Sequence, residues 1–80
     1  MTWKILDDHL TKEFTFTNYT KAVEFVTKIL PLANKADHHP DILIHSYKKV
    51  KIILITHSQN KITSKDHSLA KQIDLLPNSK

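Results

Sequence analysis

The stretch SYKKVKIILITH, residues 46–57, decides the fold because it is the clearest β-strand signal in the chain. Successive side chains of a strand point to opposite faces of a sheet, so its residues divide into two alternating sets. The more consistently apolar set is expected to face the core: Lys48, Val50, Ile52, Leu54 and Thr56. The other set, which begins at Tyr47 and continues through Lys49 and Lys51, is expected to point away from it. The stretch therefore predicts a sheet with one buried face.

Three shorter strands are expected around this one. Residues 3–6 form a short mixed segment, and KEFTFT at residues 12–17 alternates polar and apolar side chains, with Phe14 and Phe16 on one face. A turn over residues 7–9 would let these two segments pair as a hairpin. Residues 42–45 give the third short strand, directly before the strong one.

The first helix is expected to begin after a cap at Thr17 or Asn18 and to end within residues 35–38, before a proline. Apolar side chains recur at three- and four-residue spacing, which is typical of a helix with one buried stripe. The stripe consists of Ala22, Phe25, Val26, Ile29 and Ala33. Pro31 lies inside this pattern and predicts a kink or an early end, because proline lacks a backbone donor and clashes with the preceding turn.

The second helix is expected to follow a turn over residues 59–61. Thr63 or Ser64 would cap its first turn, and Asp66 is spaced to complete a capping box with Thr63. Its buried stripe is expected to consist of Leu69, Ala70 and Ile73.

The expected order is therefore strand, strand, helix, strand, strand, helix. Because strands do not alternate singly with helices, this order favours an α+β fold: a four-stranded antiparallel sheet with two helices packed on one face. Residues 1–80 leave room for a single domain with a thin core. A domain of this size without disulfides often gains stability by association, so a homodimer or homotetramer is expected.

The composition excludes several classes of function. The chain has no cysteine for thiolate chemistry and no glycine for the phosphate loops that depend on it. The net charge of +4 comes from scattered lysines with no arginine, which favours a solubilising surface and no nucleic-acid partner. No apolar stretch reaches the ~18–20 residues of a membrane span, and the N-terminus does not resemble a secretory signal. A cytoplasmic protein without a membrane partner is expected.

The histidines carry the chemical signal. His38 and His39 stand before Pro40 at the expected exit of the first helix, and His57 stands at the end of the strong strand. Imidazole exchanges protons near neutrality, with an ordinary pKa of about 6.5. The chain has six histidines, and the other three are interpreted as structural or surface residues: His9, His45 and His67.

Three interpretations of His38, His39 and His57 compete. Three imidazoles and a water would suit zinc, but adjacent histidines tend to point apart and no HExxH pair is present, so no metal is expected. A histidine at a helix exit can also simply bond free carbonyl groups. The third interpretation is metal-free acid–base catalysis or ligand binding, since the strand can bring His57 back alongside the helix exit.

Taken in order, these motifs resemble the pterin-4a-carbinolamine dehydratase family. The resemblance lies in His38-His39-Pro40, an aromatic residue at Tyr47, Thr56-His57 and an aspartate that opens the last helix, Asp66. The upstream FTFTNYTKAVEFV is similar to the family's Phe-x-Phe strand and Ala-x-x-Phe-Val helix. DHSLAKQID is similar to its closing helix, and Trp3 matches the tryptophan before the first strand. The resemblance extends from Trp3 to Asp74.

The resemblance implies a dehydratase that removes water from 4a-hydroxytetrahydropterins to give quinonoid dihydropterin, in support of aromatic amino-acid hydroxylation and without cofactor or metal. It implies that His38 and His57 form the acid–base pair and that His39 binds and orients the pterin. Asp66 would orient a histidine or the pterin, or simply cap the helix. The neighbours that would contact the ligand are Asp37, Thr56 and Ser58.

The chain also departs from the family pattern. Asn34 stands where the family usually has a glutamate, and Lys61 replaces a turn glycine, which leaves Asn60 to take a left-handed conformation. One additional residue between Pro40 and Tyr47 indicates a bulge or a longer loop, and the family's N-terminal helix is absent. Animal members of the family also act as dimerisation partners of a transcription factor. A non-catalytic pterin-binding or protein-interaction module on the same scaffold is therefore the alternative.

Overall fold

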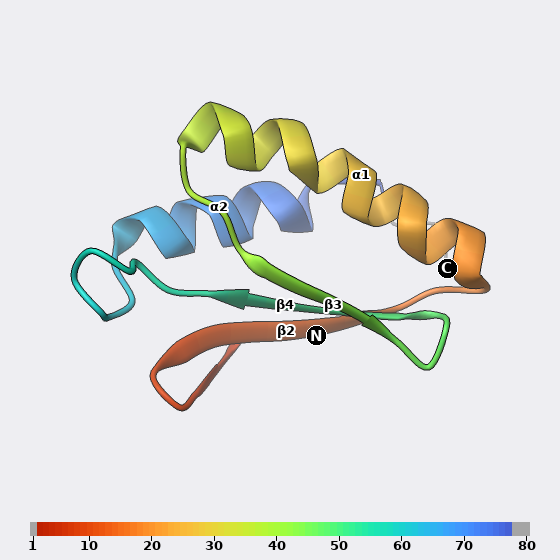
Figure 1. Ribbon diagram of the computed structural model, residues 1–80, viewed down its shortest axis with the longest axis horizontal. Helices are drawn as coiled ribbons and strands as arrows, with labels where there is room; N and C mark the ends of the chain where they lie inside the picture. The colour runs from red at the N-terminus through yellow and green to blue at the C-terminus, as the bar shows by residue number, and fades with distance from the viewer. Residues whose placement is uncertain (1, 78–80) are drawn as a thin grey trace.

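The computed structural model describes residues 2–77. In chain order its elements are β1 Lys4–Leu6, β2 His9–Thr15, α1 Tyr19–Ala36, β3 Asp41–His45, β4 Lys49–Leu54 and α2 Ser64–Asp74. The strands form one four-stranded sheet in the order β1-β2-β4-β3, and every neighbouring pair is antiparallel. Figure 1 shows both helices on the same side of this sheet. The expected α+β fold is thus confirmed.

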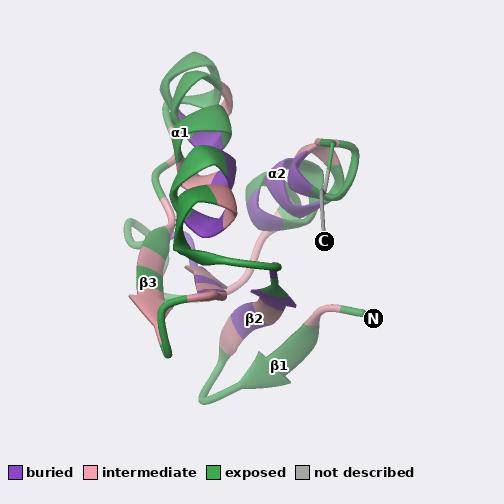
Figure 2. Cartoon of the chain, turned by 90° about the vertical axis from the view of Figure 1, so that its right-hand side faces the viewer, coloured by how far each residue is buried: buried purple, intermediate pink, exposed green. Residues whose placement is uncertain are grey.

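The core lies between the sheet and the two helices. The inward side of β4 is fully buried. Its neighbour β2 pairs with it in the same sheet, with Leu10 opposite Leu54 and Phe14 opposite Val50. Figure 2 shows that the buried parts of both helices are turned toward the sheet and toward each other. The largest fully buried apolar side chains are Phe25, Ile29, Val50, Ile52, Leu54, Leu69 and Ile73. The predicted apolar stripes of both helices and the apolar set of the strong strand therefore do form the core.

Helix α1 begins at the predicted cap and is longer than its proline suggested. The Asn18 side chain accepts a hydrogen bond of 2.9 Å from the backbone N–H of Lys21. The helix then continues through Pro31 and ends at Ala36, within the predicted range of 35–38, so the early end at Pro31, which was predicted as the alternative to a kink, is wrong. Pro31 is exposed, whereas Ile29 and Ala33 on either side of it are buried in the core. Burial of these neighbours stabilises the helix against the loss of one backbone hydrogen bond.

The strong strand is shorter than predicted because its ends turn. Ser46 and Tyr47 adopt left-handed φ angles of 51° and 50°, so Tyr47 lies in the hairpin loop and not on the outer face of the strand. The register between β3 and β4 is unbroken from Asp41 opposite Ile53 to His45 opposite Lys49. The additional residue in this region therefore produces no bulge within the paired strands.

The first hairpin forms as predicted, with a tighter turn. Asp7 and Asp8 take φ angles of 50° and 63°, and His9, which was expected in the turn, opens β2. Strand β2 accordingly starts earlier and ends earlier than residues 12–17. In a chain without glycine, aspartate and asparagine supply most of the left-handed positions among the described residues, since their short polar side chains tolerate this conformation, and Ser46 and Tyr47 supply the two in the β3–β4 hairpin. Within residues 2–77, no helix has the length and apolar character needed to cross a bilayer.

Candidate functional site

The end of α1 places the two adjacent histidines. Asp37 caps the helix in a left-handed conformation, with φ 51° and ψ 43°. The backbone N–H of Asp37 bonds the carbonyl of Asn34 at 3.2 Å, and the N–H of His38 bonds that of Ala33 at 3.1 Å. These two bonds satisfy free carbonyl groups at the helix end, as in a Schellman cap. The chain therefore leaves α1 in a fixed direction, with His38 directly after the cap.

His38 is held by a buried carboxylate. Its side chain is 10% exposed, and its Nε2 lies 2.5 Å from Oδ1 of Asp66, a residue that is fully buried. Asp66 comes from the first turn of α2, so this bond joins the end of one helix to the beginning of the other. The predicted capping box is also present, since Thr63 and Asp66 bond each other's backbone N–H groups through their side chains. Capping the helix and orienting a histidine are thus combined in one carboxylate.

The second oxygen of Asp66 completes a buried network. Oδ2 lies 2.8 Å from Thr56 Oγ1 and 2.9 Å from the backbone N of Thr63. Burial alone would raise the pKa of the Asp66 carboxyl, but the hydrogen bonds from His38, Thr63 and Thr56 outweigh burial and lower this pKa. Asp66 is therefore ionised at neutral pH in spite of being buried.

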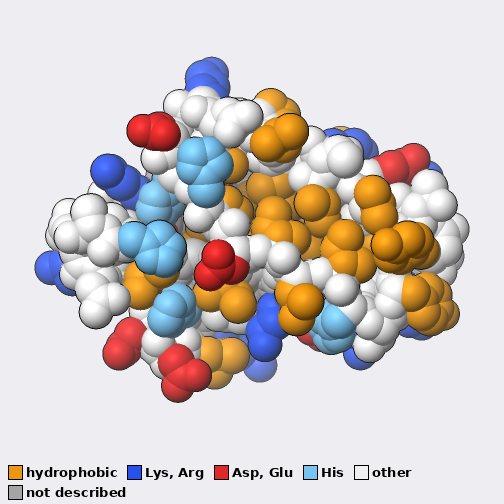
Figure 3. Space-filling view, in the orientation of Figure 1, with side chains coloured by type: hydrophobic (Ala, Val, Ile, Leu, Met, Phe, Trp, Pro, Cys, Tyr) orange, Lys and Arg blue, Asp and Glu red, His pale blue; other side chains and the backbone are white. Residues whose placement is uncertain are grey.

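The remaining predicted site residues lie around this network and are open to solvent. His39, His57, Asp37 and Ser58 are exposed, and His39 Nε2 is hydrogen-bonded to Asn34 Oδ1 at 3.0 Å. Thr56 is different, because it is only 3% exposed and directs its hydroxyl inward. His57 follows Thr56 directly, in the turn closed by the bridge between Thr56 and Lys61. Figure 3 shows several histidine side chains gathered at one end of the molecule, beside the end of α1.

The loop that carries His57 depends on one predicted turn residue. Asn60 adopts φ 53°, the left-handed conformation that was expected of it in place of a glycine. The backbone N–H of Asn60 bonds the carbonyl of His57 at 3.2 Å, and Lys61 pairs with Thr56 in both directions. The loop is therefore a closed turn, and it holds His57 beside the buried network.

A cavity adjoins His38. Its volume is about 360 Å³, and His38 lines it together with side chains from the end of α1 and one side of α2. These are Ala36, Ser64, Lys65, Ser68, Leu69 and Gln72. A larger cavity of about 460 Å³ lies over β1 and β2 and contains none of the predicted site residues. Within the described part of the chain, no three His, Asp or Glu side chains are grouped so that they could hold a metal ion.

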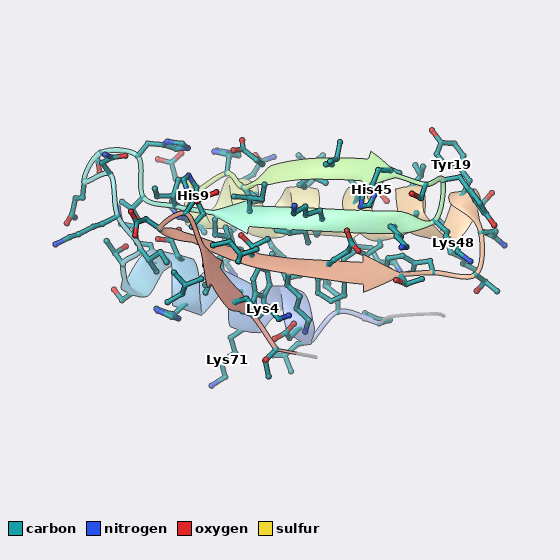
Figure 4. All side chains as sticks on the ribbon, turned by 90° about the horizontal axis from the view of Figure 1, so that it is seen from below. Lys4, His9, Tyr19, His45, Lys48 and Lys71 are labelled. Carbon is teal, nitrogen blue, oxygen red and sulfur yellow. The ribbon has the colours of Figure 1, made fainter. Side chains whose placement is uncertain are left out.

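Of the other histidines, His9 and His45 lie on the outer side of the sheet, whereas His67 is exposed in α2 directly after Asp66. His45 Nε2 is 2.5 Å from Glu13 Oε2, and His9 Nδ1 is 2.5 Å from the carbonyl oxygen of Asp7. Figure 4 shows both on the strands as seen from below, on the side away from the helices. The sequence had set His9, His45 and His67 aside, but it did not identify the hydroxyl of Thr63 as a member of the site. The capping-box pattern was the available signal, since it places Thr63 against Asp66.

Comparison with known proteins decides the family. The sequence profile described as pterin 4 alpha carbinolamine dehydratase matches residues 1–76. The chain belongs to this family. A relative from Sulfolobus acidocaldarius is 44% identical over 72 residues, which are 90% of this chain and 78% of that protein. One from Prochlorococcus marinus is 46% identical over 77 residues, 96% of this chain and 80% of that protein. Both relatives are only provisionally named pterin-4-alpha-carbinolamine dehydratase.

Two solved structures share the fold. A transcriptional coactivator/pterin dehydratase from Brucella melitensis aligns with a TM-score of 0.83 and 31% identity, over 90% of this chain and 78% of that one. A pterin dehydratase-like protein described as a RuBisCO assembly factor in the alpha-carboxysome aligns with a TM-score of 0.80 over 100% of this chain and 94% of that one. At 22% identity, the second likeness shows a common fold alone. Proteins that share this fold have therefore been described with more than one function.

Proposed function

We propose that this chain is a 4a-hydroxytetrahydropterin dehydratase that acts by histidine acid–base catalysis in pterin recycling. The observation that carries the proposal is the placement of His38. It is nine-tenths buried against the ionised Asp66, at the end of the molecule that also carries His39 and His57. A histidine held in one orientation by a carboxylate is an effective proton carrier near neutrality. Family membership supplies the substrate class.

The reaction needs two proton transfers. The bond between C4a and the hydroxyl oxygen breaks, and the oxygen leaves as water after it receives a proton from one group. A second group takes the proton from the pterin nitrogen, and the electron pair of that N–H bond forms the new C=N bond of quinonoid dihydropterin. In this proposal His38 and His57 exchange these protons, and His39 binds and orients the ring. Asp37 and Ser58, exposed beside these histidines, contact the ligand.

Turnover of a 4a-hydroxytetrahydropterin by the purified chain tests this proposal. The carbinolamine would be generated in the assay, and its conversion to quinonoid dihydropterin followed by ultraviolet absorbance. We expect a rate well above the uncatalysed one, in proportion to protein concentration. The absence of turnover would overturn the proposal, whether or not the chain binds pterin.

A second candidate function is a non-catalytic pterin-binding or interaction module. Asn34 favours it, because an amide cannot act as a base and here it is hydrogen-bonded to His39 Nε2. A ring nitrogen occupied in this way is less available to a ligand. Tight pterin binding in a titration, together with no acceleration of carbinolamine breakdown, would favour this module over the enzyme.

We further propose that the chain forms a homodimer or homotetramer in the cytoplasm. Within the described sheet, β3 pairs only with β4, so its other edge is open to another strand. Large apolar side chains are exposed on the elements at this edge: Leu43 at 52% on β3, Tyr47 at 60% in the hairpin after β3, and Leu30 at 59% on α1. Figure 3 shows hydrophobic side chains gathered over this side of the molecule.

Association is expected to depend on this apolar surface. Leu30→Lys should shift the mass measured by sedimentation toward the monomer, because it places a charge on the surface that association buries. Leu75→Lys is the matched control, since Leu75 is 77% exposed at the end of α2, away from β3. A monomer at all concentrations, or an equal effect of both variants, would contradict the proposed interface.

A further inference from the structure

The hydrogen bonds around Asp66 determine where the protons of the neighbouring groups lie. Asp66 is fully buried, and three groups surround its carboxylate: His38 Nε2 at 2.5 Å from Oδ1, and Thr56 Oγ1 and the Thr63 backbone N at 2.8 and 2.9 Å from Oδ2. Thr56 Oγ1 also lies 2.6 Å from Thr63 Oγ1. No buried side-chain nitrogen or oxygen among the described residues lacks a hydrogen-bond partner. The positions of the protons can therefore be worked out one after another.

The directions of both hydroxyl protons follow from the charge on Asp66. An ionised carboxylate only accepts hydrogen bonds, so Thr56 donates its one hydroxyl proton to Oδ2. Thr56 then has no proton left for Thr63, and Thr63 must be the donor in the bond between the two hydroxyls. The oxygen of Thr63 in turn accepts the backbone N–H of Lys65, at 3.3 Å. The result is a one-way chain of donors that ends on the carboxylate.

The charge on Asp66 also determines which nitrogen of His38 carries the proton. Since Asp66 has no proton to give, Nε2 of His38 must carry the proton of their 2.5 Å bond. A neutral imidazole has one N–H, so its other nitrogen, Nδ1, then holds a free lone pair. We propose that Thr56, acting with Thr63 through Asp66, is a positioning residue that holds His38 in its Nε2–H tautomer, so that Nδ1 is the base that takes the proton from the substrate.

This inference rests on the proposed function and deepens it in two ways. First, it assigns the base to His38 and leaves His57 to protonate the leaving hydroxyl. A carboxylate on Nε2 stabilises the imidazolium that forms when Nδ1 takes a proton. Second, it changes the role of Thr56. The family resemblance implied contact with the ligand, but a residue that is 3% exposed and gives its only proton to Asp66 acts through the carboxylate instead.

The test is nitrogen-15 NMR of the imidazole rings, well above the ordinary histidine pKa of about 6.5. The wild-type chain is expected to show a protonated Nε2 and an unprotonated Nδ1 for His38. Thr56→Val removes the hydroxyl donor that helps to orient the Asp66 carboxylate, so this carboxylate should hold Nε2 of His38 less firmly. A mixture of tautomers is expected, together with a kcat about tenfold lower and a KM changed by less than about twofold. Thr56→Ser keeps the hydroxyl and should restore both the tautomer and kcat.

Thr11→Val is the matched control, because Thr11 is a buried threonine, 6% exposed, that is not bonded to Asp66. Its hydroxyl donates one long hydrogen bond of 3.4 Å to the backbone carbonyl of His9 in β2. This variant should leave the His38 tautomer and kcat unchanged. The NMR measurement needs no turnover, so it separates this inference from the proposed function. A protonated Nδ1 in the wild-type chain overturns the inference even if the chain is an active dehydratase. If Thr56→Val does not fold, a mixture of His38 tautomers in Thr56→Ser overturns the inference as well. A raised KM at constant kcat in Thr56→Val also overturns it.

Discussion

Replacing His38 by alanine is expected to lower kcat for carbinolamine dehydration about 100- to 10,000-fold, the usual contribution of a positioned acid–base group. His38 is the histidine whose ring is fixed, since its side chain is 10% exposed and its Nε2 is bonded to Asp66. Without the imidazole, no comparably oriented group remains to take a proton from the pterin. The measurement is kcat by absorbance under substrate saturation, compared with the uncatalysed rate in the same buffer.

His45→Ala is the matched control for this prediction. His45 also pairs with a carboxylate at 2.5 Å, that of Glu13, but on the side of the sheet away from the helices. The His45→Ala variant should therefore retain the kcat of the wild-type chain. His57→Ala should lose most of the activity too, and the double variant His38→Ala/His57→Ala should lose little more than the worse single variant, because acid and base act as a unit. Full activity in the double variant would rule out the histidine mechanism.

The fold was predictable because its signals are local and repeated. Alternation in β4 identified the buried set, and the spacing of Phe25, Ile29 and Ala33 identified the buried side of α1. The boundaries were harder to predict. Tyr47 has high strand propensity, yet it adopts a left-handed conformation because the hairpin between β3 and β4 must turn there. Pro31 does not end α1, because Ile29 and Ala33 on either side of it are buried in the core. The apolar stripe predicted their burial, but not that this burial would outweigh the lost hydrogen bond.

The sequence named candidate site residues but not the contacts between them. The family resemblance named His38 and Asp66 together, and the capping-box spacing predicted the position of Asp66 at the start of α2. The sequence did not show that one carboxylate oxygen holds His38 while the other receives Thr56. That arrangement depends on how the end of α1, the end of β4 and α2 meet, which is set by packing across the core.

Asp66→Ala is expected to destabilise the fold by about 3–5 kcal/mol at pH 7, because it removes the central member of a buried charged network. The variant leaves the backbone N–H of Thr63, the hydroxyl of Thr56 and Nε2 of His38 without their acceptor. The measurement is urea denaturation followed by circular dichroism. Protein concentration must be held fixed, since association would add to the apparent stability.

The pH dependence separates a buried charge from a simple packing defect. Hydrogen bonding lowers the pKa of Asp66 in the folded chain below its unfolded value of about 3.9, so the carboxylate contributes its full stability above that value. This contribution to stability is lost as the pH falls through the pKa that Asp66 has in the folded chain. The difference in unfolding free energy between wild type and Asp66→Ala should thus be largest at pH 5–7 and shrink below about pH 4.

Asp74→Ala provides the matched control in the same helix. Asp74 pairs with Lys12 at 2.8 Å and accepts the Trp3 indole N–H at 3.0 Å, but its side chain is 38% exposed. An ion pair in contact with water contributes only about 0.2–1 kcal/mol, so this variant should lose much less than Asp66→Ala. Equal losses in the two variants, or a loss at Asp66 that does not change between pH 7 and pH 3, would mean that the buried network is held by packing. In that case the ionised carboxylate would not be what fixes His38.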